Sequence, residues 1–247
     1  LGSANSAVID TYDIDNSCRW GTADEYMTLN PGTSSDVKTC TLSFWAKLGV
    51  PDGNGTDYFF SNHIDADNRV RVHISNTANF AVFGKLSGST YIDVYSSVKY
   101  RDTSAWYNFM VILDSTDSTA ADRAQLWVNG ARVTALVTTD TPQPDADADV
   151  RLGTSDNMTI GAGHSGSAAN SNPYDGYLSE IHFIDGQKKA ATDFGEFDED
   201  SGIWKPKKYI GTYGNNGFFM EFKGTGTSAD SSGIGADTSG NDNHFAV

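Results

Sequence analysis

Short runs in which apolar and polar residues alternate, separated by turn residues, constrain this chain more than any other feature of its sequence. In residues 41–48, one set of alternate side chains is Leu, Phe, Ala and Leu, and the other includes Ser, Trp and Lys. Residues 69–75 and 91–98 alternate in the same way. A period of two residues places successive side chains on opposite faces of an extended strand. The pattern therefore predicts antiparallel strands with one face buried and one face in water.

One strand is expected to be buried on both faces, and one hairpin can be placed from its turn. Residues 106–114 are apolar at almost every position, which is typical of a central strand that is covered on both sides. Residues 124–128 lead into Asn129-Gly130, and residues 131–137 leave it. Because Asn-Gly is the favoured dipeptide of a type I′ turn, these two segments are predicted to be paired neighbours.

Helical patterns are nearly absent. The one candidate, residues 188–194, is too short to be stable without packing. About a dozen short strands without a long helix predict an all-β fold, an antiparallel β-sandwich of jelly-roll type. All-β sandwiches often reach the length of this chain as one unit, so residues 19–247 are expected to form a single domain. Residues 1–18, which lack clear periodicity, are expected to be an entry segment or linker.

The last strand-like segments are predicted to complete that domain. Phe218, Met220 and Phe222 would share one face of a strand over residues 217–223, which is too much apolar surface to leave in water. We expect this segment to be a strand of the sandwich. After a loop rich in Gly and Ser, residues 244–247 are expected to return beside the first strand, residues 19–29.

The charge of the chain disfavours two classes of partner. There are 17 Lys and Arg residues against 32 Asp and Glu residues, a formal net charge of -15 at pH 7. Such a charge repels the phosphates of nucleic acids and anionic lipid headgroups. No apolar run approaches the roughly 18 residues that a transmembrane helix needs. We therefore expect no nucleic-acid partner and no membrane insertion.

Cys18 and Cys40 are the only cysteines, too few for a fold built on disulfides or for a cysteine zinc site. A disulfide between them would stabilise the fold by roughly 3 kcal/mol in an oxidising compartment. Two unpaired, buried thiols account for the same residues equally well. The sequence leaves both possibilities open.

Calcium is a candidate cofactor. Asp52, Asn54, Thr56 and Asp57 supply oxygen-bearing side chains in one loop that also contains two glycines, as sites for hard cations often do. The loop lacks the distant Glu of an EF-hand, and Asn, Asp and Gly also form ordinary turns that bind no metal. Three further oxygen-rich clusters have the same character: Asp65 with Asp67; Asp145, Asp147 and Asp149; and Asp237 with Asn241 and Asn243.

Aromatic side chains on an outward strand face give the best indication of a sugar site. Tyr91, Asp93 and Tyr95 are predicted to share the face opposite Ile92 and Val94. An exposed ring offers a flat, rigid apolar platform at a small cost in entropy, which suits a sugar ring. The alternatives are a subunit interface, where Tyr is also enriched, or coverage by the entry segment. Tyr91, Asp93 and Tyr95 are therefore the candidate glycan-binding residues.

Several motifs, taken in their order, resemble one superfamily. Residues 19–28, 42–47 and 125–130 are similar to the opening strand, the second strand and the Asn-Gly hairpin of the concanavalin A-like lectin/glucanase superfamily, and within it of the laminin G-like domains. Residues 174–181 resemble the late strand that closes the sheet. Later motifs resemble the laminin G-like modules of virion proteins of tailed bacteriophages, especially marine ones: residues 180–187, 193–196, 202–207, 211–218 and 237–243.

The resemblance covers residues 19–247 and implies a component of a virion surface or tail fibre, without indicating what it binds. The first hypothesis is a non-enzymatic module that binds a host-surface glycan or glycoconjugate, with other virion subunits as further partners and a homo-oligomeric assembly. The location implied is the virion, an extracellular particle surface. The same resemblance allows a structural or decoration subunit that only packs against its neighbours.

A glucan hydrolase is the third hypothesis. Such enzymes need two carboxylates that flank the sugar, and in retaining enzymes these are about 5–5.5 Å apart. Glu196, Asp198 and Asp200 superficially resemble the acidic strand of laminarinase-type glucanases, but the run ends in Asp where that motif would have Glu. It also lies between glycines and has no β-branched residue, so a solvated acidic loop is the better interpretation. No His belongs to a nucleophile elbow or a zinc-binding helix, and no catalytic residue is predicted.

Overall fold

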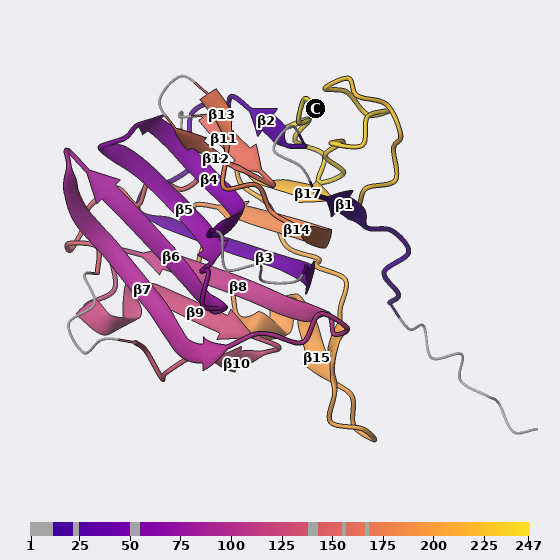
Figure 1. Cartoon of the computed structure of the whole chain (residues 1–247), viewed down its shortest axis with the longest axis horizontal. Helices are drawn as coiled ribbons and strands as arrows, with labels where there is room; N and C mark the ends of the chain where they lie inside the picture. Colours follow the sequence, from indigo (N-terminus) through magenta and orange to yellow (C-terminus); the bar gives the residue numbers. More distant parts are fainter. Residues whose placement is uncertain (1–11, 22–24, 50–54, 138–142, 155–156, 166–167) are drawn as a thin grey trace, which may run out of the picture.

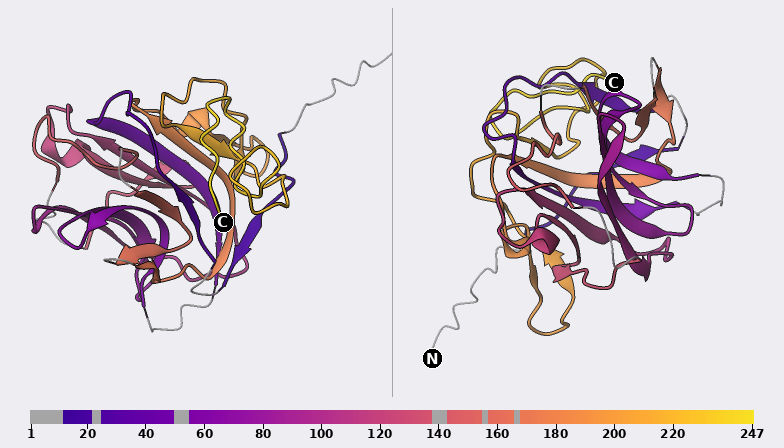
Figure 2. Two further views of the ribbon diagram at one scale, coloured as in Figure 1. Left: turned by 90° about the horizontal axis from the view of Figure 1, so that it is seen from above. Right: turned by 90° about the vertical axis from the view of Figure 1, so that its left-hand side faces the viewer.

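The computed structural model of the chain describes residues 12–21, 25–49, 55–137, 143–154, 157–165 and 168–247. Two antiparallel sheets are stacked face to face, and Figure 2 shows the two layers from above. The predicted all-β sandwich of jelly-roll type is confirmed. No helix among these residues has the length and apolar character needed to cross a membrane.

One layer is a seven-stranded sheet. Six of its strands lie side by side in the order β1 (Cys18–Trp20), β14 (Gly176–Asp185), β3 (Thr39–Leu48), β8 (Tyr107–Asp114), β9 (Ala124–Val128) and β10 (Ala131–Arg132). The short strand β17 (Phe218–Met220) pairs with β14 on the edge that β1 also uses.

The other layer is a six-stranded sheet with the order β2 (Met27–Leu29), β11 (Asn157–Ile160), β4 (Asp57–Asp65), β5 (Asn68–Ile74), β6 (Asn79–Leu86) and β7 (Ser89–Lys99), and it faces the viewer in Figure 1. Two small hairpins, β12 (Gly163–Ser165) with β13 (Ala168–Ser171) and β15 (Gly195–Phe197) with β16 (Trp204–Pro206), and two 3-10 turns, η1 (Ala120–Asp122) and η2 (Ala191–Asp193), complete the described elements.

The predicted central strand is β8, and it is buried on both faces. Phe109, Val111 and Leu113 point into the main core between the two sheets. Met110 and Ile112 point the other way and belong to a second apolar cluster, which includes Trp204 and Phe194 from the chain that follows β14. The outer face of the seven-stranded sheet is therefore covered by the segment after β14. This double coverage is the reason for the almost unbroken apolar sequence of β8.

The predicted hairpin is confirmed at its turn, but the strand that leaves it is shorter than expected, because residues 135–137 hydrogen-bond to β7 instead of β9. β9 and β10 pair in antiparallel fashion, with Val128 opposite Ala131. Asn129 and Gly130 both have positive φ, 49° and 75°, as a type I′ turn requires.

The C-terminal segment closes the sandwich as predicted, although its strand is shorter than expected. Phe218 and Met220 have no exposed surface, and Phe222 is 5% exposed. The backbones of Thr28 and Ala246 exchange two hydrogen bonds of 2.8 and 2.9 Å, which places the C-terminus beside β2. Figure 1 shows this last part of the chain, in yellow, next to β1, β2 and β17.

The described end of the entry segment lies along β14. Tyr12 donates a 2.5 Å hydrogen bond to the Glu180 carboxylate, and Ser179 donates to the carbonyl of Asn16. Both cysteines are free thiols, Cys18 half-buried and Cys40 buried. Burial raises the pKa of the Cys18 thiol to about 11, so this thiol is protonated at neutral pH.

Candidate functional site

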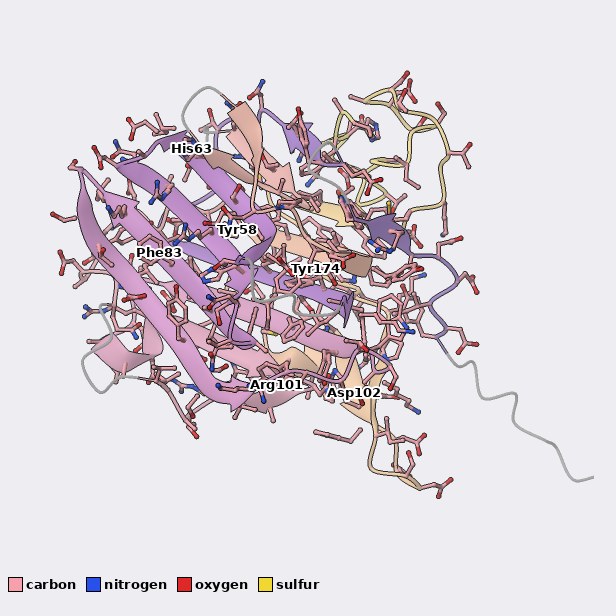
Figure 3. All side chains as sticks on the ribbon, viewed as in Figure 1. Tyr58, His63, Phe83, Arg101, Asp102 and Tyr174 are labelled. Carbon is pink, nitrogen blue, oxygen red and sulfur yellow. The ribbon has the colours of Figure 1, made fainter. Side chains whose placement is uncertain are left out.

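Side chains on the outer face of the six-stranded sheet form the strongest candidate site. In β5, Val70, Val72 and Ile74 point into the core, so the alternating residues must point outward. Strand register then aligns outward residues of four neighbouring strands: Tyr58 of β4, Arg71 and His73 of β5, Phe83 of β6, and Asp93 and Tyr95 of β7. We call these six residues the outer-face cluster. Figure 3 labels Tyr58 and Phe83 on this sheet.

Arg71 is the centre of the outer-face cluster. Its guanidinium carbon lies 4.3 Å from the centre of the Phe83 ring and 4.9 Å from that of Tyr58. It also donates a hydrogen bond to the Tyr58 hydroxyl. Burial raises the pKa of the Tyr95 phenol, and the positive charge of Arg71 acts in the opposite direction. Contacts of a cation with ring faces are attractive, so Arg71 fixes the neighbouring rings.

His73 lies beneath these side chains with no exposed surface. Its Nε2 is 3.1 Å from the Tyr95 hydroxyl. Burial, together with the positive charge of Arg71, lowers the pKa of His73 to about 3. The imidazole is therefore neutral at neutral pH and holds the Tyr95 hydroxyl in place.

The pKa of His73 predicts a specific sensitivity to acid. In the unfolded chain the pKa of His73 would be near 6.5, the ordinary value for histidine, whereas in the folded protein the imidazole stays neutral down to about pH 3. As the pH falls from 7 to 5, the unfolded state takes up a proton that the folded state cannot. Stability is therefore lost below the unfolded pKa, and His73 should contribute a fall of about 2 kcal/mol in the free energy of unfolding. Urea unfolding at both pH values measures it.

The variant His73→Gln is the control for this experiment. It cannot take up the proton, so its free energy of unfolding should fall less between pH 7 and 5 than that of the wild type. An equal fall in both proteins would contradict the prediction.

Asp93 gives the outer-face cluster a carboxylate. Burial raises its pKa, and the charge of Arg71 acts in the opposite direction. Rings, a guanidinium and a carboxylate thus lie within one patch. Rings can stack on the C–H face of a sugar, and the charged groups can accept from or donate to its hydroxyls.

Buried polar atoms without a hydrogen-bond partner are concentrated on this face. Folded proteins satisfy the great majority of such atoms, so a concentration of exceptions distinguishes one surface from the others. Within the part of the chain that the structure describes, the unpartnered atoms on this face include Arg69 Nε, Arg71 Nε, His73 Nδ1 and Thr159 Oγ1.

The structure brings together two of the three predicted glycan-binding residues and corrects the third. Asp93 and Tyr95 lie on the outer face, but Tyr91 does not. The register shifts between Gly84 and Lys85, and this β-bulge turns Tyr91 toward the core, where its hydroxyl donates to the carbonyl of Val150 over 2.9 Å. A bulge reverses the side-chain alternation at one residue, so a strict period of two places Tyr91 wrongly.

Four residues of the cluster were not predicted as site residues: His73, which the sequence suggested only as a structural histidine, and Tyr58, Arg71 and Phe83. Tyr58, Arg71 and Phe83 come from three different strands, and only the register places them together. The available signal was the alternation of Arg71 and His73 with apolar residues over residues 69–75, which indicates a polar outer face in β5.

The predicted calcium loop is only partly described. Asp52 and Asn54 lie outside the described residues, while Thr56 lies just before β4 and Asp57 is its first residue. Among the described residues, no three His, Cys, Asp or Glu side chains form a group that could hold a metal ion. Calcium at this loop stays a prediction.

Two of the other three oxygen-rich clusters that the sequence suggested bind backbone N–H groups, and in the third Asp147 pairs with the ammonium of Lys38 at 3.0 Å. The Asp237 carboxylate accepts hydrogen bonds from the backbone N–H groups of Phe219, Ser239 and Asn243 at 2.8–3.0 Å. Asp65 accepts from the N–H of Asp67 in the turn between β4 and β5. Both carboxylates therefore act as turn-forming groups.

The acidic run that resembles a glucanase motif lies on the β15–β16 hairpin. Glu196 and Asp198 are 3.4 and 3.5 Å from the ammonium of Lys205. Asp198 also accepts hydrogen bonds from Ser201 and from the backbone of Asp200, which shapes the turn of the hairpin. These carboxylates are already engaged by the hairpin itself.

A comparison with models of protein families shows which superfamily this chain belongs to. Residues 21–192 match the Laminin G 3 family, described as the concanavalin A-like lectin/glucanases superfamily. The chain belongs to this superfamily. The match covers more than half of the sequence, and the resemblance noted from the sequence motifs is confirmed at this level. No curated protein sequence matches the chain.

Solved structures share the fold at low sequence identity. A Bacteroides ovatus protein named for a proposed role in carbohydrate binding has a TM-score of 0.51 and 12% identity, over 93% of this chain and 57% of that one. The CBM40 module of a Ruminococcus gnavus sialidase has a TM-score of 0.47 and 11% identity, over 72% and 95%. Tailspike protein 2 of Escherichia coli O157:H7 bacteriophage CAB120 has a TM-score of 0.46 and 10% identity, over 69% and 22%.

Proposed function

We propose that this protein is a non-enzymatic carbohydrate-binding module that holds a glycan on the outer face of its six-stranded sheet. The observation that carries the proposal is the outer-face cluster. Phe83 and Tyr95 are half-buried rings, Arg71 and Asp93 supply charged hydrogen-bonding groups, and His73 supports Tyr95 from below. Membership of a superfamily named for lectins and glucanases supports the same class of ligand.

Binding at this face would rely on groups that are already in position. The guanidinium of Arg71 is held by Phe83 and Tyr58, so little side-chain freedom is lost when a ligand docks. Burial raises the pKa of the Tyr95 phenol, which keeps its hydroxyl protonated and able to donate. A sugar ring would lie on the aromatic rings, with hydroxyls directed at Asp93 and Arg71.

We further propose that the ligand is a host-surface glycan or glycoconjugate and that the module stands on a virion surface or tail fibre. The support is the resemblance of the later sequence motifs to modules of tailed-phage virion proteins. In this proposal the chain assembles with other virion subunits as a homo-oligomer. A structural or decoration role is the second candidate, and it predicts assembly without glycan binding.

Binding is favoured over hydrolysis by the state of the acidic run. Lys205 pairs with both Glu196 and Asp198, and the turn uses Asp198 again. We expect no reducing sugar to be released from β-glucans by the purified protein. Release that is lost in a variant with both Glu196→Gln and Asp198→Asn would contradict the proposal.

A glycan array with the purified chain tests the proposed function. We expect binding to at least one glycan, and we expect Phe83→Ala and Tyr95→Ala each to weaken it about tenfold, because each removes one stacking ring worth roughly 1–1.5 kcal/mol. Affinities come from titration calorimetry with the glycan that scores highest.

The control variant is Ile210→Ala, which shortens a side chain that is 92% exposed and follows Tyr209, a residue of the apolar cluster on the other sheet. It should bind as the wild type does. An array on which the wild-type protein binds nothing, or binding that both ring variants retain in full, would refute the proposed function.

A further inference from the structure

A pocket lined by three tryptophans lies on the outer face of the seven-stranded sheet. Trp45 comes from β3, Trp204 from β16, and Trp106 precedes β8. The pocket has a volume of about 360 Å³, and Ile14, Asn16 and Ser179 also line it. We call it the tryptophan pocket. It is on the opposite side of the sandwich from the outer-face cluster.

One wall of the tryptophan pocket is rigid. The Trp204 indole N–H donates to the side-chain oxygen of Asn108 over 3.2 Å, and both residues are buried. A Cβ atom at Gly130 or Gly195 would lie 2.3 or 2.4 Å from the Trp204 ring. The ring therefore depends on two glycine backbones that leave room for it, and its plane is fixed before any ligand arrives.

Two exposed aromatic rings lie at the mouth of the pocket: Trp106, which lines it, and Tyr177, which packs against Trp106 without lining the pocket. Trp106 is 38% exposed and Tyr177 is 40% exposed, and their ring centres are 6.5 Å apart. The sequence pattern predicted Trp106 inside the central strand, but β8 begins at Tyr107 and Trp106 lies outside it. Within the described part of the chain, no hydrogen bond uses the Trp106 indole N–H. A large ring left in water beside an apolar pocket is available to a ligand.

The tryptophan pocket continues into a larger polar cavity. Asn16, Asp15 and Lys205 line both spaces, and the larger one has a volume of about 840 Å³. Two of its lysines are compensated within the protein: Lys205 by Glu196 and Asp198, and Lys223 by Glu221 at 2.6 Å. The lining as a whole carries more acidic than basic side chains, which favours a neutral ligand over an anionic one: Asp13, Asp15, Glu180, Glu196, Asp198 and Glu221 against Lys205, Lys207, Lys208 and Lys223.

We propose that the tryptophan pocket is a second carbohydrate site, which takes a neutral oligosaccharide. One pyranose ring stacks between Trp106 and the wall of Trp45 and Trp204, and the next sugar units extend into the polar cavity. The volume of each of the two spaces falls in the range of about 300–1,000 Å³ that ligand sites usually have. The proposal goes beyond the proposed function, because it concerns the other sheet and does not need the outer-face cluster.

Tryptophan fluorescence distinguishes the two sites. The outer-face cluster contains no Trp, whereas three of the five tryptophans of the chain line the tryptophan pocket. The experiment titrates the full chain with cellotriose, laminaritriose and maltotriose and follows the emission. We expect at least one trisaccharide to shift or quench it in a saturable manner. Trp106→Ala should weaken that binding about tenfold by calorimetry, since one stacking ring is lost.

Two further variants make the result decisive. Tyr95→Ala should keep the fluorescence response, because it changes only the outer-face cluster. Tyr177→Ala alters the mouth from the neighbouring strand and should weaken binding even if Trp106→Ala fails to fold. The proposal is overturned if no trisaccharide changes the emission, or if both mouth variants bind as the wild type does. It is also overturned if the emission changes only with protein concentration, which would identify a second copy as the occupant.

Discussion

Deletion of residues 217–247 is expected to leave an aggregating or unfolded product instead of a smaller stable domain. Phe218 lies 5.6 Å from Phe183 and 4.8 Å from Phe245, measured between ring centres. Phe222 packs edge-on against Trp20 at 5.5 Å. Each of these buried side chains contributes about 1.5–3 kcal/mol by transfer from water. Their sum approaches the whole stability of a typical domain.

Size-exclusion chromatography and thermal unfolding of the truncated chain measure this effect. The full-length variants Phe218→Ala and Phe245→Ala provide graded controls, each expected to lower the free energy of unfolding by about 3–5 kcal/mol. A truncated chain that stays monomeric and melts with an unchanged cooperative transition would show that the tail is a separate appendage and that the single-domain prediction is wrong.

Asp185→Ala is expected to lower the free energy of unfolding by about 4 kcal/mol, the largest effect of any single polar substitution proposed for this protein. Asp185 is 1% exposed, and its carboxylate accepts hydrogen bonds from the Ser34 hydroxyl and from the backbone N–H groups of Ser35 and Asn216, at 2.5, 2.6 and 3.0 Å. Removal of the carboxylate leaves three donors without their acceptor. Ser34 and Ser35 lie in one loop and Asn216 in another, so the carboxylate connects two loops. Hydrogen bonds to a charged acceptor are the stronger kind.

Urea unfolding of the wild type and the variant measures the loss. Asp200→Ala, in the exposed turn of the β15–β16 hairpin, is the matched control and should change the free energy of unfolding by less than about 0.5 kcal/mol. Asp185→Asn keeps one acceptor oxygen and should fall between the two. If Asp185→Ala unfolds at the same urea concentration as Asp200→Ala, the carboxylate does not tie these loops together.

The sequence determined those features that depend on neighbours along the chain. Alternation over residues 41–48 and 69–75 predicts which side chains enter the core, because a strand has a period of two. Asn129-Gly130 predicts its hairpin, because both residues accept positive φ. The apolar sequence of residues 106–114 predicts a strand covered on both sides, and the structure supplies both covers.

Only the tertiary structure decided which distant side chains meet. The bulge beside Gly84 turns Tyr91 into the core while leaving Asp93 and Tyr95 outside, and Arg71 reaches Tyr95 only through the register of three strands. Trp45 and Trp204 are likewise far apart in sequence but line one pocket. Local periodicity carries no information about bulge positions, strand order or the path of covering loops. Those are fixed by burial of the whole apolar surface at once, and the candidate sites follow from them.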